Sequence, residues 1–205
     1  TPVELIHHTA GDIHPPLYYL LLHFWIRLVG ASEFAAAYLS LGVGLLLIAA
    51  IYCIGSRLCG RSVGTIAALL ATVAPFQIWY SQEIRMYSLG ALLGLLAFWG
   101  AASFLQECAS APRTLLWGAV GCYVLAGALG LYAIYYVAFL LIALIVWVAI
   151  HLVRSWRFDS GNARSRTIGW LAAQCAILVL YAPWLGIALR QAVNPPVPPW
   201  RSAVS

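Results

Sequence analysis

Long apolar runs alternate with short polar connections along most of this chain. Five runs of 21 to 40 residues lack a formal charge: Phe34–Ser56, Ser62–Gln82, Met86–Gln106, Thr114–Val153 and Thr167–Leu189. A membrane helix needs about 20 apolar residues at a rise of about 1.5 Å each. Four runs therefore predict one span each, and the longest predicts two spans with a turn near Gly130–Tyr136. The pattern predicts an all-α membrane protein with about six transmembrane helices.

The apolar segment Leu17–Ile26 precedes these runs and is shorter than any of them. Pro15 and Pro16 stand before it, and Arg27 follows it. Ten helical residues extend about 15 Å, which is half the thickness of the bilayer core. Because prolines suit the first turn of a helix, we predict a helix that lies at the membrane interface. The alternative is a short, tilted seventh span that reaches Val29.

Composition supports the membrane assignment and excludes other classes. Hydrophobic residues make up 63% of the chain, charged residues make up 8%, and the mean hydropathy is +0.90. Soluble domains carry about 25% charged residues, so this chain cannot cover a water-exposed surface. That excludes a soluble enzyme and a disordered protein. The net charge of +5 comes from scattered arginines rather than a basic stripe, so we expect no nucleic-acid partner.

The arginines also predict which side of the membrane each connection faces. If six spans begin at Phe34, one set of connections carries seven arginines and the other set carries four. Cytoplasmic loops hold the excess of arginine, so the seven-arginine set is predicted in the cytoplasm. Residues 1–33 then form an extracytoplasmic loop and residues 34–189 the membrane domain. Residues 190–205 form a proline-rich outer tail that we expect to lead into a further C-terminal part.

A cluster of polar side chains occupies the predicted outer loop. His7, His8, Asp12 and His14 fall within eight residues, directly before the two prolines. Imidazole and carboxylate groups at this density can hold a divalent cation or contact a phosphate. The alternative is a histidine-rich loop that is merely solvated.

A second polar cluster lies at the predicted outer connection near residue 83. Glu83 and Arg85 stand between two apolar runs, with Tyr80 and Tyr87 on either side. Charges at membrane depth are costly and are usually paired or functional. Residues two apart do not face each other on a helix, so each charge needs a partner from elsewhere. Arginine suits phosphate and glutamate suits a metal, whereas the alternative is a simple interface anchor.

Aromatic residues also gather at the other predicted outer ends. They are Tyr132, Tyr135 and Tyr136 in the turn of the longest run, and Tyr181 and Trp184 in the last run. On the sequence alone, an aromatic belt at the membrane interface is the preferred interpretation.

Two of these stretches resemble a known family. Asp12–Leu21 (DIHPPLYYLL) and Trp79–Tyr87 (WYSQEIRMY) resemble recurring stretches of the GT-C membrane glycosyltransferases. The closest resemblance is to the bacterial branch related to protein O-mannosyltransferases and lipid A aminoarabinose transferases. Leu131–Tyr136 and Tyr181–Leu185 resemble two weaker landmarks of that branch, in the same order along the chain.

The resemblance implies a GT-C fold, with juxtamembrane helices in the outer loop. It implies inverting transfer of a sugar from a polyprenyl-phosphate donor to a glycan, lipid or protein acceptor. The reaction would take place on the extracytoplasmic face of the plasma (inner) membrane. The family's principal catalytic carboxylate belongs to an acidic pair that we expect upstream of Thr1. A histidine that the family often carries in the third landmark is replaced here by Ile134 or a neighbour.

The resemblance and the polar clusters together define candidate site residues. Candidates for catalysis are Asp12 and Glu83. Candidates for binding the donor phosphate are His14 and Arg85. Candidates for contacting the substrate are Tyr80, Tyr87 and Tyr135. A divalent cation is a further expectation, with Asp12, Glu83 and His14 as its ligands.

Two other readings of the chain stay open at this stage. One is a non-enzymatic membrane protein, such as a transporter subunit or a scaffold. Transporters tend to show internal repeats and polar groups at the midplane. This chain shows no repeat, and its polar clusters lie at one predicted face. The other reading is a family-like protein that has lost activity.

Overall fold

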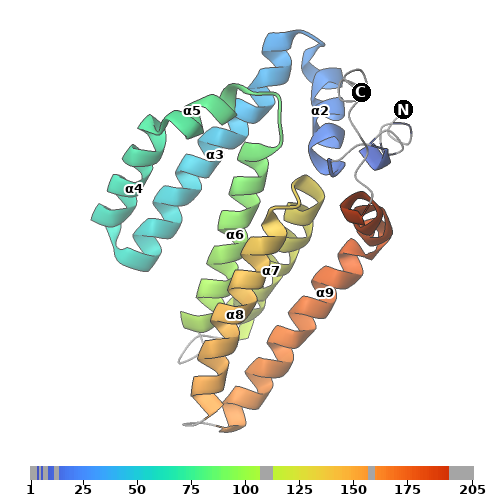
Figure 1. The fold of residues 1–205 in the computed structure, drawn as a ribbon. Coiled ribbons are helices and arrows are strands. Elements are labelled where there is room, and N and C mark those ends of the chain that lie inside the picture. Colours follow the sequence, from blue (N-terminus) through green and yellow to red (C-terminus); the bar gives the residue numbers. More distant parts are fainter. Residues whose placement is uncertain are drawn as a thin grey trace.

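The fold was analysed in a computed structural model of the chain. It describes residues 4, 6, 9–11, 14–106, 113–156 and 160–193. For residues 113–116 and 160–162 it describes the backbone only. The described elements are all helices (Figure 1). They are α2 (Leu17–Val29), α3 (Glu33–Cys59), α4 (Arg61–Val73), α5 (Pro75–Gln82), α6 (Tyr87–Gln106), α7 (Arg113–Ala133), α8 (Val137–Trp156) and α9 (Ser160–Val193).

Several of these helices are long and apolar enough to cross a membrane. Within the described residues four meet that condition alone: α3, α6, α8 and the Ala163–Val193 part of α9. The bent pair α4 and α5 can count as a fifth span. This confirms the all-α, polytopic membrane fold. The sixth predicted span corresponds to α7, of which the segment Trp117–Ala133 counts among the shorter apolar helices of the described residues.

The predicted span Ser62–Gln82 corresponds to the bent pair α4 and α5. The chain breaks at Ala74, and the axes of α4 and α5 differ by 60°. Pro75 causes the break because it has no N–H to continue the helix and its ring forces the preceding residue out of the helical region. Ala74 is accordingly extended, with φ −67° and ψ 121°, and Pro75 begins α5. The bend turns α5 across the end of the bundle.

The short helix α2 runs three residues further than the predicted Leu17–Ile26. It ends at Gly30, whose φ of +99° suits glycine and stops the helix. Thirteen residues extend about 20 Å, which is less than the hydrocarbon thickness. The helix therefore reaches Val29 without becoming a seventh span of ordinary length.

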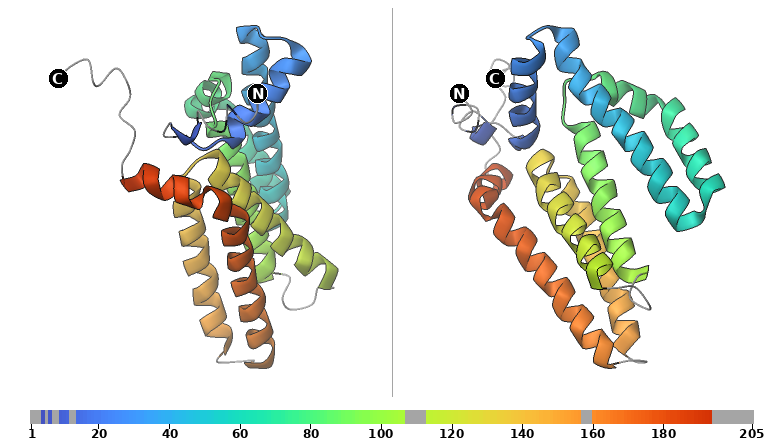
Figure 2. Two further views of the ribbon diagram at one scale, coloured as in Figure 1. Left: turned by 90° about the vertical axis from the view of Figure 1, so that its right-hand side faces the viewer. Right: turned by 180° about the vertical axis from the view of Figure 1, so that it is seen from behind.

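The ends of the helices gather in two layers. In Figure 1, α2, the α5–α6 junction, the α7–α8 turn and the C-terminal end of α9 lie at the upper end. The end of α6, the start of α7 and the end of α8 lie at the opposite end, and the α3–α4 turn lies between the two levels, below α5; Figure 2 shows the same from two other sides. This is the alternation that the arginine pattern assumed. Which end faces the cytoplasm stays a prediction.

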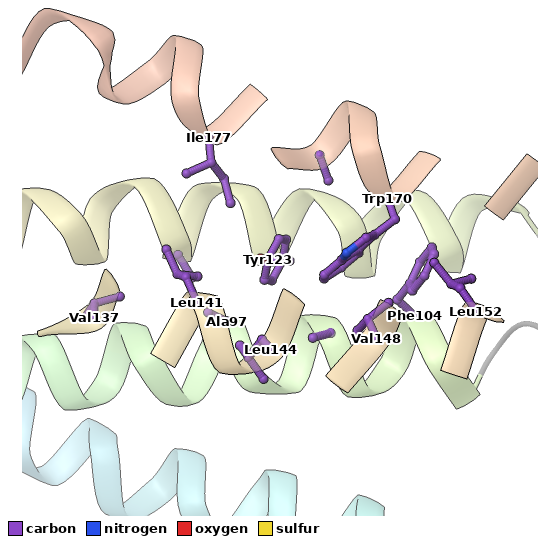
Figure 3. Close-up of a cluster of buried hydrophobic side chains, with 13 residues drawn as sticks. Ala97, Phe104, Tyr123, Val137, Leu141, Leu144, Val148, Leu152, Trp170 and Ile177 are labelled. Atoms are coloured by element: carbon purple, nitrogen blue, oxygen red, sulfur yellow. The ribbon is translucent and has the colours of Figure 1, made fainter. Parts of the chain in front are cut away.

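The main core joins α6, α7, α8 and α9. Buried side chains from all four helices meet there, among them Phe104, Tyr123, Val148 and Trp170 (Figure 3). The aromatic rings of Tyr123 and Trp170 lie 4.5 Å apart between centroids. Gly100 lets α6 and α7 approach closely, since a Cβ there would lie 2.7 Å from the Tyr123 backbone nitrogen. Close approach at small residues is the usual way helices pack in lipid.

The last two helices differ in detail from the predicted segments. The turn of the longest run comprises Ile134–Tyr136, inside the predicted Gly130–Tyr136. The last helix begins at Ser160 and continues to Val193, through Pro183, beyond the predicted span Thr167–Leu189. The first four residues of the predicted tail 190–205 are therefore helical, and the rest of that tail lies outside the described residues.

Candidate functional site

The predicted outer loop joins the helical bundle at a group of buried residues that precede and begin α2. Pro15 and Pro16 are buried, and Tyr18, at the start of α2, is 1% exposed. The Tyr18 and Ser40 hydroxyls share a hydrogen bond of 2.7 Å, which ties α2 to α3. His14 lies just before the prolines, with its ring edge-on to Tyr19 at 6.3 Å between centroids. Asp12, His7 and His8 lie outside the described residues.

The second polar cluster occupies the bend between α5 and α6. Glu83 follows α5 in an extended conformation, and the Trp79 indole N–H donates to its Oε1 at 2.8 Å. Arg85 is exposed, and among the described residues neither Glu83 nor Arg85 forms a salt bridge. The rings of Tyr80 and Tyr87 flank the bend at 4.6 Å between centroids. The exposed Arg85 guanidinium is open to an anion.

Ser40 brings the two family-like stretches together. Its hydroxyl also lies within donating distance of the Arg85 carbonyl, at 3.4 Å, beside the shorter bond that it shares with Tyr18. Tyr18 also packs in a cluster with Met86 and Leu89 of the second stretch. Residues about 70 apart in sequence therefore meet at one end of the bundle. The convergence of the His14 and Glu83 side chains on one cavity stays a prediction, since the contact observed joins neighbouring residues.

The third and fourth landmarks also meet at this end. Tyr132 donates its hydroxyl hydrogen to the Leu180 carbonyl at 3.1 Å and stacks edge-on against Tyr181. Trp184 donates its indole N–H to the Tyr135 hydroxyl at 3.0 Å. These contacts pack the α7–α8 turn against α9, close to Pro183. The aromatic residues are therefore partners of one another, which a plain interface belt does not require.

Tyr135 is held by groups of the protein on both sides. It accepts from Trp184 and donates to the Gln191 Oε1 atom. Burial raises the pKa of Tyr135, and the hydrogen bond with Trp184 opposes this to a smaller extent. The hydroxyl therefore stays protonated near neutral pH and remains a donor to Gln191. These bonds fix the position of the hydroxyl, and the predicted contact of Tyr135 with the substrate stays a prediction.

Gln191 connects this aromatic cluster to the outer loop. Its Nε2 atom donates to the Thr9 and Ala10 carbonyls at 3.1 and 3.3 Å. Arg190 adds a bond from Nη2 to the Ala10 carbonyl at 3.1 Å. Gln191 and Thr9 are each 6% exposed, so the junction is buried. Sequence reasoning missed Ser40, which lies within an apolar run, and Gln191, which follows Arg190 just after one.

Two open cavities lie beside the second polar cluster. One, of about 570 Å³, is formed by the start of α3 and the end of α5, including Glu33, Ser81 and Gln82. The other is a groove of about 470 Å³ between α6 and α8, with Tyr87 and Tyr136 on its lining. Below these tyrosines the groove lining is apolar. Among the described residues no three His, Cys, Asp or Glu side chains come together as a metal site.

Sequence comparison agrees with this architecture. Residues 13–187, more than four fifths of the chain, match the family model of dolichyl-phosphate-mannose-protein mannosyltransferases. No curated protein and no solved structure was found to match. Because the match covers both family-like stretches and the membrane helices, this chain belongs to that family of membrane glycosyltransferases. It is accordingly a multi-pass membrane protein of the mannosyltransferase type.

Proposed function

We propose that this protein transfers a sugar from a polyprenyl-phosphate donor to an acceptor at the extracytoplasmic face of the plasma membrane. One observation carries the proposal: Tyr18 and Ser40 join the two family-like stretches at one end of the bundle, beside the exposed Arg85. The same end holds the aromatic cluster and the upper part of the α6–α8 groove. Within the family, the proposed place of the chain is the bacterial branch related to protein O-mannosyltransferases and lipid A aminoarabinose transferases, which Asp12–Leu21 and Trp79–Tyr87 resemble.

The proposed reaction is an inverting displacement at the anomeric carbon. The acceptor oxygen forms a bond to that carbon while the bond to the donor phosphate oxygen breaks. The electron pair leaves with the phosphate, and a carboxylate base takes the acceptor proton. As in glycoside hydrolysis, the sugar acquires oxocarbenium character.

The protein must stabilise the charge that grows on the leaving phosphate. Arg85 suits this role because its guanidinium is exposed and offers a planar fork for phosphate oxygens. His14 is the second proposed phosphate ligand. Asp12 and Glu83 are proposed to orient these groups. Loss of one such contact is expected to cost about 2.7–4 kcal/mol of barrier, as for an oxyanion donor.

The groove between α6 and α8 is proposed to receive the first part of the donor's polyprenyl chain. Tyr87 lies on its lining, two residues after Arg85, so a phosphate at Arg85 would place the chain beside the groove. Gly90 and Gly94 have no side chains to project into the groove from α6. The remaining lining is apolar, with Leu95, Phe98 and Leu140 among its residues, and suits a hydrocarbon chain.

A divalent cation at Asp12, Glu83 and His14 remains a proposal of its own. Carboxylate oxygens and an imidazole nitrogen are suitable ligands for such an ion. Treatment of the purified full-length protein with EDTA is expected to reduce transfer, and added Mg²⁺ or Mn²⁺ is expected to restore it. Unchanged transfer after EDTA would exclude the cation, and Arg85 and His14 would then be the only proposed ligands of the phosphate.

The decisive experiment compares Arg85→Lys with Arg27→Lys in the full-length protein. Transfer from radiolabelled polyprenyl-phosphate sugars is measured at matched membrane levels. If Arg85 holds the phosphate, lysine keeps the charge but loses the fork, and transfer falls strongly. Arg27, at the end of α2, is also exposed at the same end of the bundle, and lysine there should be tolerated.

Other outcomes of this experiment have clear meanings. Transfer by Arg85→Lys near the wild-type level would remove Arg85 from the site. Absence of transfer by the wild type across a panel of donors would favour the non-enzymatic reading, a transporter subunit or scaffold, or an inactive family member.

A further inference from the structure

The outer loop is held to the membrane bundle at two described points. Tyr18 fixes the start of α2 through Ser40. Gln191 and Arg190, at the end of α9, fix the carbonyls of Thr9 and Ala10. His14 lies between these two points, four residues after Ala10 and four before Tyr18. The segment that carries this phosphate-binding candidate is therefore anchored on both sides.

Gln191 is the link between that segment and the α7–α8 turn. Its amide N–H group faces the loop, and its Oε1 atom accepts from Tyr135, which is itself fixed by Trp184. The neutral amide donates to both carbonyls from its nitrogen and accepts from the phenol at its oxygen, which an ionised carboxylate cannot do. Because Gln191 is only 6% exposed, water cannot readily replace these hydrogen bonds if they are lost.

We propose that Gln191 is a positioning residue for glycosyl transfer, which sets the position of the outer loop and so the placement of His14 toward the donor phosphate. This inference rests on the proposed function. Gln191 touches neither donor nor acceptor in this role. It acts through the Thr9 and Ala10 carbonyls, so its loss would leave the catalytic groups present but misplaced.

The test uses two variants of Gln191 and one matched control in the full-length protein. Gln191→Glu keeps the shape and the acceptor for Tyr135 but, when ionised, has no hydrogen to donate to the carbonyls. Gln191→Leu removes both functions. Gln174→Leu is the control: this glutamine is on the same helix and accepts from Tyr123, but its amide donates to its own helix at Trp170.

Steady-state transfer provides the first readout. Both Gln191 variants should raise the donor KM and lower the donor kcat/KM on the order of tenfold to a hundredfold, because small misplacements of binding groups have effects of that size. Gln174→Leu should stay within about twofold of the wild type. A loss of folded protein would lower the apparent kcat and leave the donor KM unchanged, so the KM separates positioning from general destabilisation.

A distance measurement provides a readout that does not need activity. Spin labels at Ile6→Cys, three residues before the Thr9 anchor, and Leu178→Cys, on α9, are introduced into a cysteine-free background. Both side chains are exposed. The wild type and Gln174→Leu should give one narrow distance distribution, and both Gln191 variants should give a broad one.

The results separate this inference from the proposed function. Unchanged donor KM in both Gln191 variants would overturn the positioning role, as would a narrow distance distribution in both. If the wild type transfers no sugar at all, the proposed function fails. The spin-label distances alone then decide whether Gln191 holds the loop.

Discussion

Individual hydroxyl groups determine how the candidate site is assembled. Tyr18 was part of a family-like stretch, but its partner Ser40 is one of several hydroxyl residues in a charge-free run. Nothing in the local pattern distinguishes Ser40 from a tolerated serine in a membrane helix. Its role becomes visible only when α2 packs against α3. Residue types at the site were therefore readable from the sequence, whereas their partners were not.

Removal of the Tyr18 hydroxyl should destabilise the fold. Tyr18→Phe leaves the buried Ser40 hydroxyl with only its weaker bond to the Arg85 carbonyl, at a cost of about 0.5–1.5 kcal/mol. Thermal unfolding of the purified protein in detergent should show a lower midpoint. Tyr52→Phe on α3, where the tyrosine is 42% exposed, is the control and should leave the midpoint unchanged. Equal midpoints for both variants would contradict the role of Tyr18.

At the scale of the helix, the sequence predicted the existence of the elements better than their shape. Charge-free runs marked α3, α6 and α8 within a few residues, because charges are excluded from lipid. The bend at Ala74–Pro75 was missed because Pro75 lies inside a charge-free run, and the count of apolar residues does not register a break. Pro183 shows the opposite result: α9 continues past it. A proline in the sequence therefore does not by itself predict whether the helix will break there or continue.

The α3–α4 pair depends on a glycine at its contact. A Cβ at Gly64 would lie 2.1 Å from the Ser56 Oγ and 2.7 Å from the Tyr52 carbonyl oxygen. Gly64→Ala should therefore push the helices apart and destabilise the fold by about 1–3 kcal/mol, the usual cost of overpacking. Gly42→Ala on α3, which meets nothing within 4 Å, should be neutral or slightly stabilising. Chemical denaturation or thermal unfolding of both variants measures the difference.

Filling the α6–α8 groove tests the proposed path of the donor chain. Ala91 is exposed on the groove lining, so Ala91→Trp should occupy the groove without disturbing the core. The donor KM should rise several-fold while the acceptor KM stays unchanged. Ala143→Trp, exposed on α8, places the same bulk outside that lining and serves as the control. Equal donor KM values in the two variants would exclude the groove as the chain's path.

At the scale of the whole molecule, the arrangement of helix ends supports the predicted alternation. Arg57 and Arg61 lie at the α3–α4 turn, away from the end of the bundle that holds Arg85 and Arg190. Counting arginines could predict which connections share a side because a helix that crosses the membrane must reverse the side of its ends. It could not reveal that α4 is peripheral, with its tertiary contacts to α3 and α5.

The orientation of the bundle is directly testable. With Arg57, Arg61 and their companions in the cytoplasm, the α3–α4 turn faces inward and the start of α3 faces outward. In a cysteine-free background, an impermeant thiol reagent should label Ala31→Cys in intact cells, and label Ser62→Cys only after permeabilisation. Both positions are exposed. The reverse labelling pattern would overturn the proposed extracytoplasmic site.

The bond between Gln191 and Thr9 has a consequence for biosynthesis. The two residues are separated by 182 positions, so the ribosome produces one long before the other. Chains are made from the N-terminus, and contacts of such separation form late. The loop with His14 therefore cannot be secured by α9 until the last described helix has been inserted. A nascent or truncated chain would carry the phosphate-binding candidates without this anchor, which delays a fully assembled site until insertion is complete.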